Sequence, residues 1–353
     1  MKKISKVNNF KILAPFVNVD QVGLLREAGA DELYCGYIDE EAEKLWPSQF
    51  VTMNHRGKGH SFEDFNTFKF AIEKACRCNL PVYVTMNGLY TPEQYPWLLK
   101  TINKISELKG VRGLIIADMG LLLTLNKINY KKEIHISTVA GPTFNYSTAD
   151  FFNSLGASRI ILDRQLAVEE IVDLISLRKT NIAIELFIAA DSCLFIDGYC
   201  TFIHYLDIQG ENLRRVNKIG LVKSYNTDIP THAGCQETKA LLLNRKFEIY
   251  NISGVKKCKN HFRFNYKIYP YLCNLCALYE LKCFKEITLK VAWRGCDSPK
   301  AVKMVSSALK NLSRKDISYK LYREKARALH FGLLGSNCTI DQCYSSGFLT
   351  RKG

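Results

Sequence analysis

The sequence contains no long apolar run. Across its 353 residues no stretch reaches the ~18 apolar residues that a membrane-spanning helix needs. The N-terminus, Met1 to Lys11, is polar and basic and lacks the apolar core of a secretory signal peptide. We therefore expect a cytoplasmic protein with no membrane partner.

Common hydrolase motifs are also missing. There is no His-Glu-x-x-His and no Gly-x-Ser-x-Gly, which argues against a zinc protease and against a serine hydrolase with a nucleophile elbow. Neither usual zinc-ribbon spacing is present, because only one Cys-x-x-Cys occurs. A thiol peptidase stays open as an alternative, since His135, His204 or His232 could approach a cysteine in space.

Acidic residues are few relative to basic ones. The chain has 49 Lys and Arg against 34 Asp and Glu, a net charge of +15. Two interpretations stay open: a surface that attracts RNA or a small anion, or a Lys-rich proteome that raises the charge of every protein. We interpret the basic run 310–327 as a solvated helical face.

Short apolar segments alternate with helical ones. Seven strands are predicted at Phe10–Pro15, Asp31–Gly36, Pro81–Met86, Gly113–Ala117, Ile134–Ser137, Arg159–Leu162 and Ile182–Ile188, and an eighth at Ile287–Ala292. The helices predicted after them are Val22–Ala28, Phe62–Cys78, Pro92–Leu108, Gly120–Asn126, Ser147–Leu155, Val168–Leu177 and Pro299–Leu309. This alternation predicts an α/β fold, a closed (β/α)8 TIM-like barrel with a cysteine-rich insertion between strands 7 and 8. An open doubly wound sheet is the alternative.

The predicted domains follow from this pattern. Residues 1–190 and 285–312 form the barrel, 191–284 the cysteine-rich insertion, and 313–353 a C-terminal extension. Catalysis in such barrels occurs at the C-terminal ends of the strands. Polar residues that we place at this rim are Asn87, Asp118, Ser137, Arg164, Glu185 and Arg294.

Glu185 is a single carboxylate on an apolar strand. We expect it to act as a general acid or base, with a buried ion pair to an arginine such as Arg164 as the alternative. Arg164 and Arg294 would pair with a substrate carboxylate or phosphate. The candidate catalytic residues are Glu185, Arg164, Asp118 and Asn87, and the candidate substrate-binding residues are Ser137, Asn145 and Arg294.

Ten of the 13 cysteines lie from Cys193 onward. A reducing compartment argues against disulfides, so clustered thiols indicate metal or redox chemistry. The candidate ligands are Cys193, Cys200, Cys235 and Cys273, with Cys276 as an alternative to Cys273. They would hold an iron–sulfur cluster or zinc, and buried unligated thiols are the remaining interpretation. A second site could use Cys283, Cys296, Cys338 and Cys343, and Cys35 could face the pocket.

Several motifs together resemble those of one family. Glu185-x-Phe187 followed by Cys193, four residues, Gly198, x and Cys200 is similar to the signature of the U32 peptidase family, often called collagenase-like. The likeness extends to Val84-Thr-Met-Asn87, to His135-Ile-Ser-Thr138 and to Asn145. The sequence departs from the signature at Ala189, Ala190 and Asp191.

The resemblance implies more than proteolysis. Members of this family hold a [4Fe–4S] cluster on four cysteines and act in oxygen-independent hydroxylation of RNA or ubiquinone precursors, with prephenate linked to the reaction. Cys193 and Cys200 match the first cysteine pair, and Cys235 and Cys273 fit the later two. We therefore expect an iron–sulfur protein that modifies RNA or a small anionic molecule. The alternatives are a peptidase, or a non-catalytic, metal-stabilised subunit of a homodimer or heterodimer.

Overall fold

The computed structural model describes residues 10–45, 61–190, 196–199, 272–293, 297–335, 337–338 and 343. The chain divides into a unit of residues 1–200 with 269–353 and a second unit of residues 201–268, all of which lie outside the described residues. All elements named below belong to the first unit. The predicted domain boundaries stay a prediction.

Eight parallel strands form a closed ring. In ring order they are β1 (Phe10–Pro15), β2 (Glu32–Tyr37), β4 (Val82–Met86), β5 (Val111–Ile116), β6 (Glu133–Ile136), β7 (Arg159–Ile161), β8 (Ala183–Ala190) and β10 (Ile287–Val291). β1 pairs with both β10 and β2, which closes the sheet. The predicted TIM-like barrel is confirmed, and this closure excludes the open doubly wound sheet.

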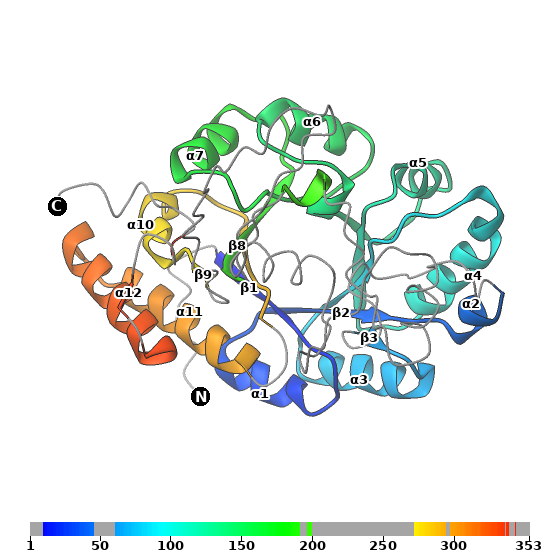
Figure 1. Cartoon of the computed structure of the whole chain (residues 1–353), viewed down its shortest axis with the longest axis horizontal. Coiled ribbons are helices and arrows are strands. Elements are labelled where there is room, and N and C mark those ends of the chain that lie inside the picture. The colour runs from blue at the N-terminus through cyan, green and yellow to red at the C-terminus, as the bar shows by residue number, and fades with distance from the viewer. Residues whose placement is uncertain are drawn as a thin grey trace, which may run out of the picture. The chain divides into compact units, whose positions relative to one another are not determined.

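Helices surround the ring of strands (Figure 1). Those that connect or follow barrel strands are α1 (Gln21–Ala28), α3 (Phe65–Arg77), α4 (Tyr95–Ser106), α5 (Met119–Lys127), α6 (Tyr146–Ser154), α7 (Val168–Leu177) and α11 (Ser298–Leu312). Smaller or additional elements are α2 (Glu40–Leu45), β3 (Ser61–Phe62), β9 (Leu272–Cys273), α10 (Leu278–Leu281) and α12 (Tyr319–Leu334). None of the described helices is both long and apolar enough to cross a membrane.

Most predicted elements lie where the sequence places them, and the exceptions have physical causes. Every barrel strand begins and ends within two residues of its prediction. α3 begins later than predicted because residues 61–62 pair with β2 as β3, and because Asp64 caps the helix by accepting a hydrogen bond from the Thr67 amide at 2.6 Å.

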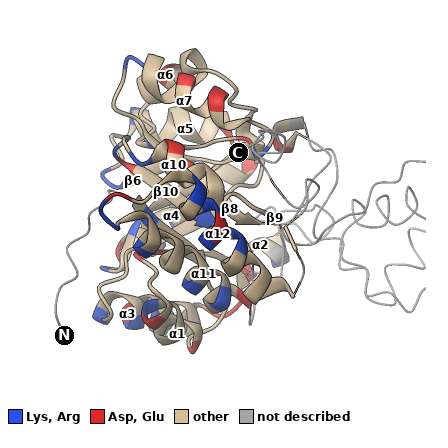
Figure 2. Ribbon diagram, turned by 90° about the vertical axis from the view of Figure 1, so that its left-hand side faces the viewer, with Lys and Arg blue, Asp and Glu red and all other residues tan. Residues whose placement is uncertain are grey.

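The basic run 310–327 is not solvated throughout. It includes the start of α12, which packs along α11, and Figure 2 shows Lys and Arg residues spread over both helices. Tyr322 is fully buried and the Arg323 side chain is largely buried. Our interpretation of this run as a solvated face was therefore wrong at these positions.

Alternation along the strands builds two cores. One side-chain set points outward against the helices and the other points into the barrel, as the period of two requires. The inner apolar set consists of Leu13, Tyr34, Tyr83, Ile115, Ile161, Phe187 and Ala190. Cys35 follows Tyr34 and packs in the outer core, where burial raises the pKa of its thiol. It therefore does not face the pocket, which was one possibility for this residue.

Candidate functional site at the C-terminal rim of the barrel

Glu185 lies inside the barrel rather than at its rim. It is near the start of β8 and its side chain is fully buried. The Lys290 ammonium donates to its Oε1 at 2.5 Å, and the Arg159 guanidinium lies 3.4 Å from its Oε2. The arginine partner is therefore Arg159 and not Arg164, because Glu185 pairs in register with Ile161 and Arg164 follows the end of β7.

The Glu185 carboxylate belongs to a charge-balanced interior network. Arg159 also donates to Glu32 at 2.8 Å, and its guanidinium carbon lies 5.0 Å from the centre of the Tyr83 ring. Burial by itself would raise the pKa of Glu185, but Lys290 and Arg159 outweigh it and lower the pKa. A general acid needs a pKa near the working pH, so this environment favours a structural role. A catalytic role for Glu185 stays a prediction.

His135 also lies inside the barrel. Its Nε2 is 3.3 Å from a Glu133 oxygen, and its ring centre lies 4.2 Å from that of Tyr83. Burial lowers the pKa of the imidazole, the positive charge of Arg159 adds to this, and Glu133 opposes it. These contacts place His135 among the polar groups of the barrel interior.

Two predicted rim residues meet over the mouth of the barrel. Asn87 follows β4 and Ser137 follows β6, and the Asn87 amide donates to the Ser137 hydroxyl at 3.3 Å. β5 lies between these two strands, so the contact crosses its C-terminal end. The pair therefore presents hydrogen-bonding groups at the end of the barrel where TIM-barrel enzymes bind substrate.

Asp118 and Asn145 serve as helix caps. One Asp118 oxygen accepts from the Leu121 amide and the other from the Tyr90 amide, at 2.7 and 3.1 Å. The exposed Asn145 accepts from the Thr148 amide at 3.0 Å. Capping accounts for both residue types at these positions. Their proposed catalytic and substrate-binding roles stay predictions.

Arg164 forms an ion pair with a carboxylate at the rim, that of Asp197. Its Nη2 donates to Asp197 at 2.8 Å, and its guanidinium carbon lies 4.6 Å from the Phe187 ring centre. The hydroxyl of Thr138, at the start of the 3-10 helix η3 (Thr138–Ala140), donates to the same Asp197 oxygen at 2.9 Å. Asp197 begins a 3-10 turn, η4 (Asp197–Tyr199), so these two bonds fix the turn on the barrel. We call Arg164, Thr138 and Asp197 the rim clasp.

Gly198 allows this turn to sit close to the rim. A Cβ added to it would lie 2.6 Å from both the backbone nitrogen and the Cδ atom of Pro142. A larger residue would push η4 away from the rim. Close backbone approach is thus the physical reason for glycine at this point of the segment between Cys193 and Cys200.

Asp163 is a site residue that our sequence reasoning missed. It follows β7 and is only 3% exposed, and neither of its carboxylate oxygens accepts a hydrogen bond of good geometry from the described residues. Burial and the nearby Asp197 raise its pKa to about 6, although Arg164 and the backbone of Asp197 and Thr143 partly offset them. Its place directly after the predicted strand 159–162 is the signal that could have found it, whereas its closeness to Asp197 exists only in the folded chain.

Four of the described cysteines, Cys273, Cys276, Cys338 and Cys343, lie near the end of β8. Cys193, Cys200, Cys235 and Cys296 lie outside the described residues, as does Arg294. Cys273 lies on β9, where it pairs with Ala189 of β8. It is therefore beside the strand end that precedes Cys193 in the sequence. This position agrees with the ligand role that we assign to Cys273.

Three further thiols approach Cys273. Cys343 forms an isolated β-bridge with it, and burial followed by the charges of Cys338, Cys343 and Cys276 raises the pKa of the Cys273 thiol. Burial and then Cys338 raise the pKa of Cys276 to about 11, against the effect of nearby arginines. Cys283, by contrast, is exposed. Cys338 and Cys343 therefore lie near Cys273 and Cys276. Our predicted second site instead combined them with Cys283 and Cys296.

These thiols have the right chemistry for a soft metal but no preformed geometry. Within the described ranges, no three His, Cys, Asp or Glu side chains form a group that could hold a metal ion. Thiolates select zinc and iron–sulfur clusters, and a thiol with a raised pKa must lose its proton on binding. Cys273 and Cys276 fit such a group by type and position, and its other predicted ligands lie outside the described residues.

The family model for peptidase family U32 matches residues 17–225, more than half of the chain. The chain belongs to peptidase family U32. It is 30% identical over 194 residues to tRNA hydroxylation protein P of Helicobacter pylori (55% of this chain and 42% of that protein). The corresponding protein of Escherichia coli is 25% identical over 202 residues (57% and 41%).

Another relative of the chain is named for proteolysis and not for hydroxylation. A collagenase of Porphyromonas gingivalis is 24% identical over 218 residues, covering 58% of this chain and 47% of that protein. The chain spans less than half the length of each of these three relatives. The solved structure of the U32 peptidase Mk0906 is 15% identical with a TM-score of 0.42, covering 65% of this chain and 85% of that one.

Proposed function

We propose that this U32 protein acts in the oxygen-independent hydroxylation of a nucleoside in tRNA. The observation that carries the proposal is its similarity to proteins named tRNA hydroxylation protein P over more than half of the chain. The net charge of +15 is compatible with an RNA substrate. Prephenate is the co-substrate that the family resemblance suggests.

The cofactor that we propose is a [4Fe–4S] cluster, with zinc as the alternative. Cys193, Cys200, Cys235 and Cys273 would hold it, and Cys276 could replace Cys273. The bound cluster would supply electron transfer or Lewis-acid activation. The position of Cys273 beside the end of β8 supports this set, because Cys193 follows the same strand.

The rim clasp would position the first cysteine pair. Asp197 lies between Cys193 and Cys200, and its bonds to Arg164 and Thr138 attach that segment to the barrel. In this arrangement Arg164 orients the thiols through Asp197 instead of binding a substrate anion directly. Asn87 and Ser137, which hydrogen-bond to each other at the same rim, would contact the substrate.

A thiol peptidase is the weaker candidate. Cys273 does lie beside a histidine, with its Sγ 3.3 Å from His330 Nδ1. A nucleophilic cysteine needs a lowered pKa, and burial and neighbouring thiols raise that of Cys273 instead. This environment suits a metal ligand better than a nucleophile.

The test is nucleoside mass spectrometry of tRNA from a strain that lacks the gene. We expect one hydroxylated nucleoside to disappear and to return with the wild-type gene but not with Cys193→Ser. The matched control is Cys283→Ser, an exposed thiol outside the proposed set, which should restore the nucleoside fully. The same two variants, purified without oxygen, should differ in iron content and in absorbance near ~400 nm.

Three outcomes would contradict parts of the proposal. An unchanged nucleoside profile in the deletion strain would remove tRNA as the substrate. A colourless protein that contains zinc would replace the cluster by a zinc site. Full iron content in Cys193→Ser would show that the ligand set is wrong.

A further inference from the structure

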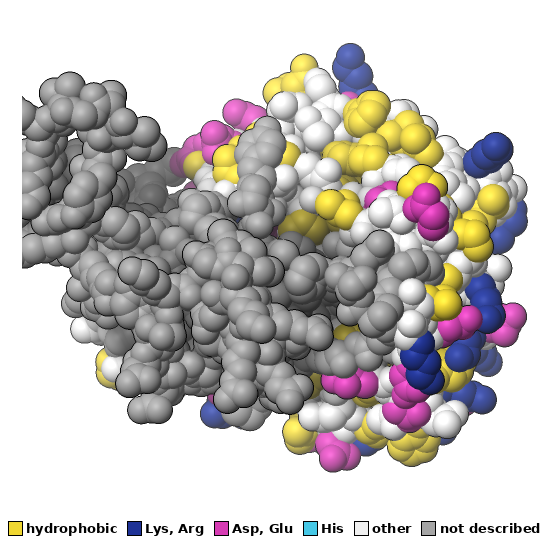
Figure 3. All heavy atoms as spheres, turned by 45° about the vertical axis from the view of Figure 1, so that its right-hand side comes forward, with side chains coloured by type: hydrophobic (Ala, Val, Ile, Leu, Met, Phe, Trp, Pro, Cys, Tyr) yellow, Lys and Arg dark blue, Asp and Glu magenta, His cyan; other side chains and the backbone are white. Residues whose placement is uncertain are grey.

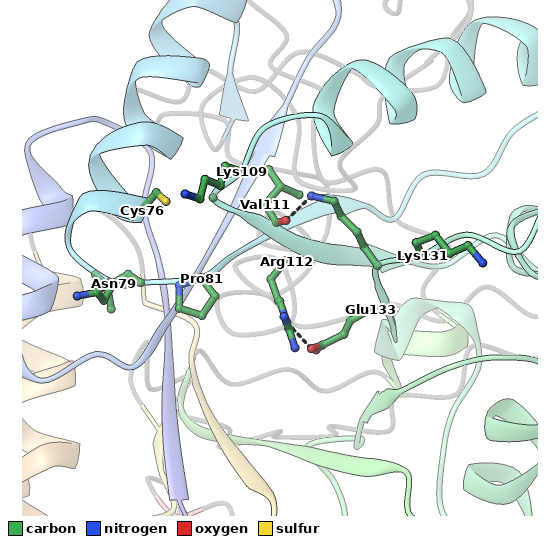
Figure 4. Close-up of a pocket in the computed structure, with 11 residues that line it drawn as sticks. Cys76, Asn79, Pro81, Lys109, Val111, Arg112, Lys131 and Glu133 are labelled. Carbon is green, nitrogen blue, oxygen red and sulfur yellow. Dashed lines mark hydrogen bonds and ion pairs between the residues drawn. The ribbon is translucent and has the colours of Figure 1, made fainter.

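A pocket opens at the end of the barrel opposite the rim. It lies at the N-terminal ends of β4, β5 and β6 and has a volume of about 580 Å³ (Figure 4). Loops that enter these three strands line it: residues 79–81 before β4, 109–112 at the start of β5, and 131–133 at the start of β6. Neither the thiols at the rim nor the rim clasp contribute to it. We call it the basic pocket.

Four cations and one anion line the basic pocket: Lys109, Arg112, Lys131, Lys132 and Glu133. The anion, Glu133, already has hydrogen-bonding partners. Glu133 accepts from Arg112 at 2.7 Å and from Tyr83 at 3.0 Å, and His135 lies 3.3 Å away. Burial would raise the pKa of Glu133, but these contacts lower it to about 2. Glu133 therefore compensates Arg112 and leaves three lysines.

Lys132 shows that the remaining positive charge is not compensated. Its ammonium donates to the carbonyl oxygens of Val111 and Leu108 at 2.6 and 3.4 Å, which are neutral acceptors. Burial and then the charge of Arg112 lower its pKa. Because neither carbonyl acceptor carries a charge, the Lys132 ammonium keeps its net positive charge in the pocket, and a bound anion would compensate it.

Lys109 and Lys131 are the two exposed lysines of the pocket, and we call them its free arms. Both are exposed, they lie on opposite sides of it (Figure 4), and neither forms an ion pair among the described residues. The backbone beside Lys109 is fixed, because a Cβ on Gly110 would lie 2.7 Å from the carbonyl oxygen of Ile72. On the face seen in Figure 3, in contrast, acidic and basic side chains are intermingled.

We propose that the basic pocket binds the phosphodiester backbone of RNA. A phosphate brings a full negative charge and several acceptor oxygens, which suit three lysine ammonium groups around a hollow. Its place opposite the rim assigns it to substrate holding and not to chemistry. The anion chemistry stands on the pocket itself, whereas the choice of RNA as the source of the phosphate rests on the proposed function.

The test compares two double variants that change the net charge equally. Lys109→Glu with Lys131→Glu reverses the free arms, and Lys69→Glu with Lys303→Glu reverses two exposed helical lysines elsewhere. Filter binding of unmodified tRNA over a salt series gives the affinity of each full-length protein. We expect the pocket variant to lose at least ~10-fold in affinity at low salt and to reduce the salt slope by about 2. The control variant should change neither the affinity nor the salt slope by more than a small factor.

Equal losses in both variants would overturn the proposal, because net charge alone would then explain them. A second experiment titrates inorganic phosphate into each protein and measures its thermal stability. If phosphate stabilises the wild type and the control but not the pocket variant, while both variants bind tRNA like the wild type, the pocket takes free phosphate and the RNA assignment is wrong.

Failure of the proposed function has a different signature. If the deletion strain retains all its hydroxylated nucleosides while the pocket variant alone loses tRNA affinity, the pocket binds RNA and the proposed reaction is wrong. Iron content should be equal in wild type and both double variants, because the pocket contains none of the proposed ligands.

Discussion

Two buried groups of charges lie in this barrel, one in its interior and one at its C-terminal rim. In the interior, Glu32 and Glu185 face Arg159 and Lys290, so that each carboxylate has a cation within 3.4 Å. At the rim, Arg164 bonds to Asp197, whereas the nearby Asp163 carboxylate forms no ion pair with any described residue. Among the residues that the structure describes, the interior carboxylates are therefore paired with cations, whereas Asp163 at the rim is not.

The difference separates charges that hold the barrel together from charges that could act in chemistry. A balanced buried pair costs several kcal/mol to disrupt and has a pKa far from neutral. An uncompensated buried carboxylate has a pKa near neutral and can exchange a proton at physiological pH. On this comparison Asp163 is a better candidate for acid–base chemistry than Glu185, the residue that the sequence favoured.

Breaking the interior balance should have the largest effect. Glu185→Ala leaves Lys290 and Arg159 buried with one anion fewer, and we expect a loss of about 3–5 kcal/mol in the free energy of unfolding. Urea denaturation measures it, with Glu73→Ala on the exposed face of α3 as the control, expected within about 0.5 kcal/mol of wild type. A loss below ~1 kcal/mol together with lost hydroxylation would instead make Glu185 catalytic.

Pushing the turn η4 off the rim should have an intermediate effect. Gly198→Ala places a Cβ against the Pro142 backbone, and we expect a loss of about 1–3 kcal/mol and a lower iron content. Gly332→Ala is the matched control, because that position lies in α12 with no atom within 4 Å. It should stabilise the protein by up to about 1 kcal/mol. Melting shifts of the same sign and size in both variants would show that Gly198 has no special role in the packing of η4.

Replacing the Asp163 carboxylate should have the smallest effect on the free energy of unfolding, and it should raise this free energy instead of lowering it. The folded state raises the pKa of Asp163 from 3.8 to about 6, so the folded protein binds more protons than the unfolded chain between these values. Its contribution to stability therefore decreases as the pH rises through this window. Asp163→Asn removes that decrease and should stabilise the protein by about 1–2 kcal/mol at pH 8 and hardly at pH 4.

Denaturation at several pH values measures this effect. Asp173→Asn is the control, since Asp173 is exposed on α7 and its replacement should change the free energy of unfolding by less than about 0.5 kcal/mol. A destabilised Asp163→Asn protein at pH 8 would mean that the carboxylate has a cationic or donor partner, and the contrast between rim and interior would then disappear.

Local patterns in the sequence predicted the elements of the fold well. The order of strands and helices, the closed barrel and the placement of Asn87 and Ser137 at strand ends followed from apolar periodicity and from the geometry of parallel strands. The glycine at position 198 was visible as part of a signature, but its close approach to Pro142 was not. Apolar period and turn residues act over a few neighbours, and for that reason a sequence reveals them.

What only the tertiary structure decided is the pairing of charges and thiols over long distances. Glu185 meets Lys290 across 105 positions of the chain, Thr138 meets Asp197 across 59, and Cys273 meets His330 across 57. Whether a carboxylate is neutralised depends on which side chains ring closure brings inside the barrel. The sequence by itself determined that this chain forms a barrel with a polar rim. Strand register and packing determined which of its acids are balanced and which one is not.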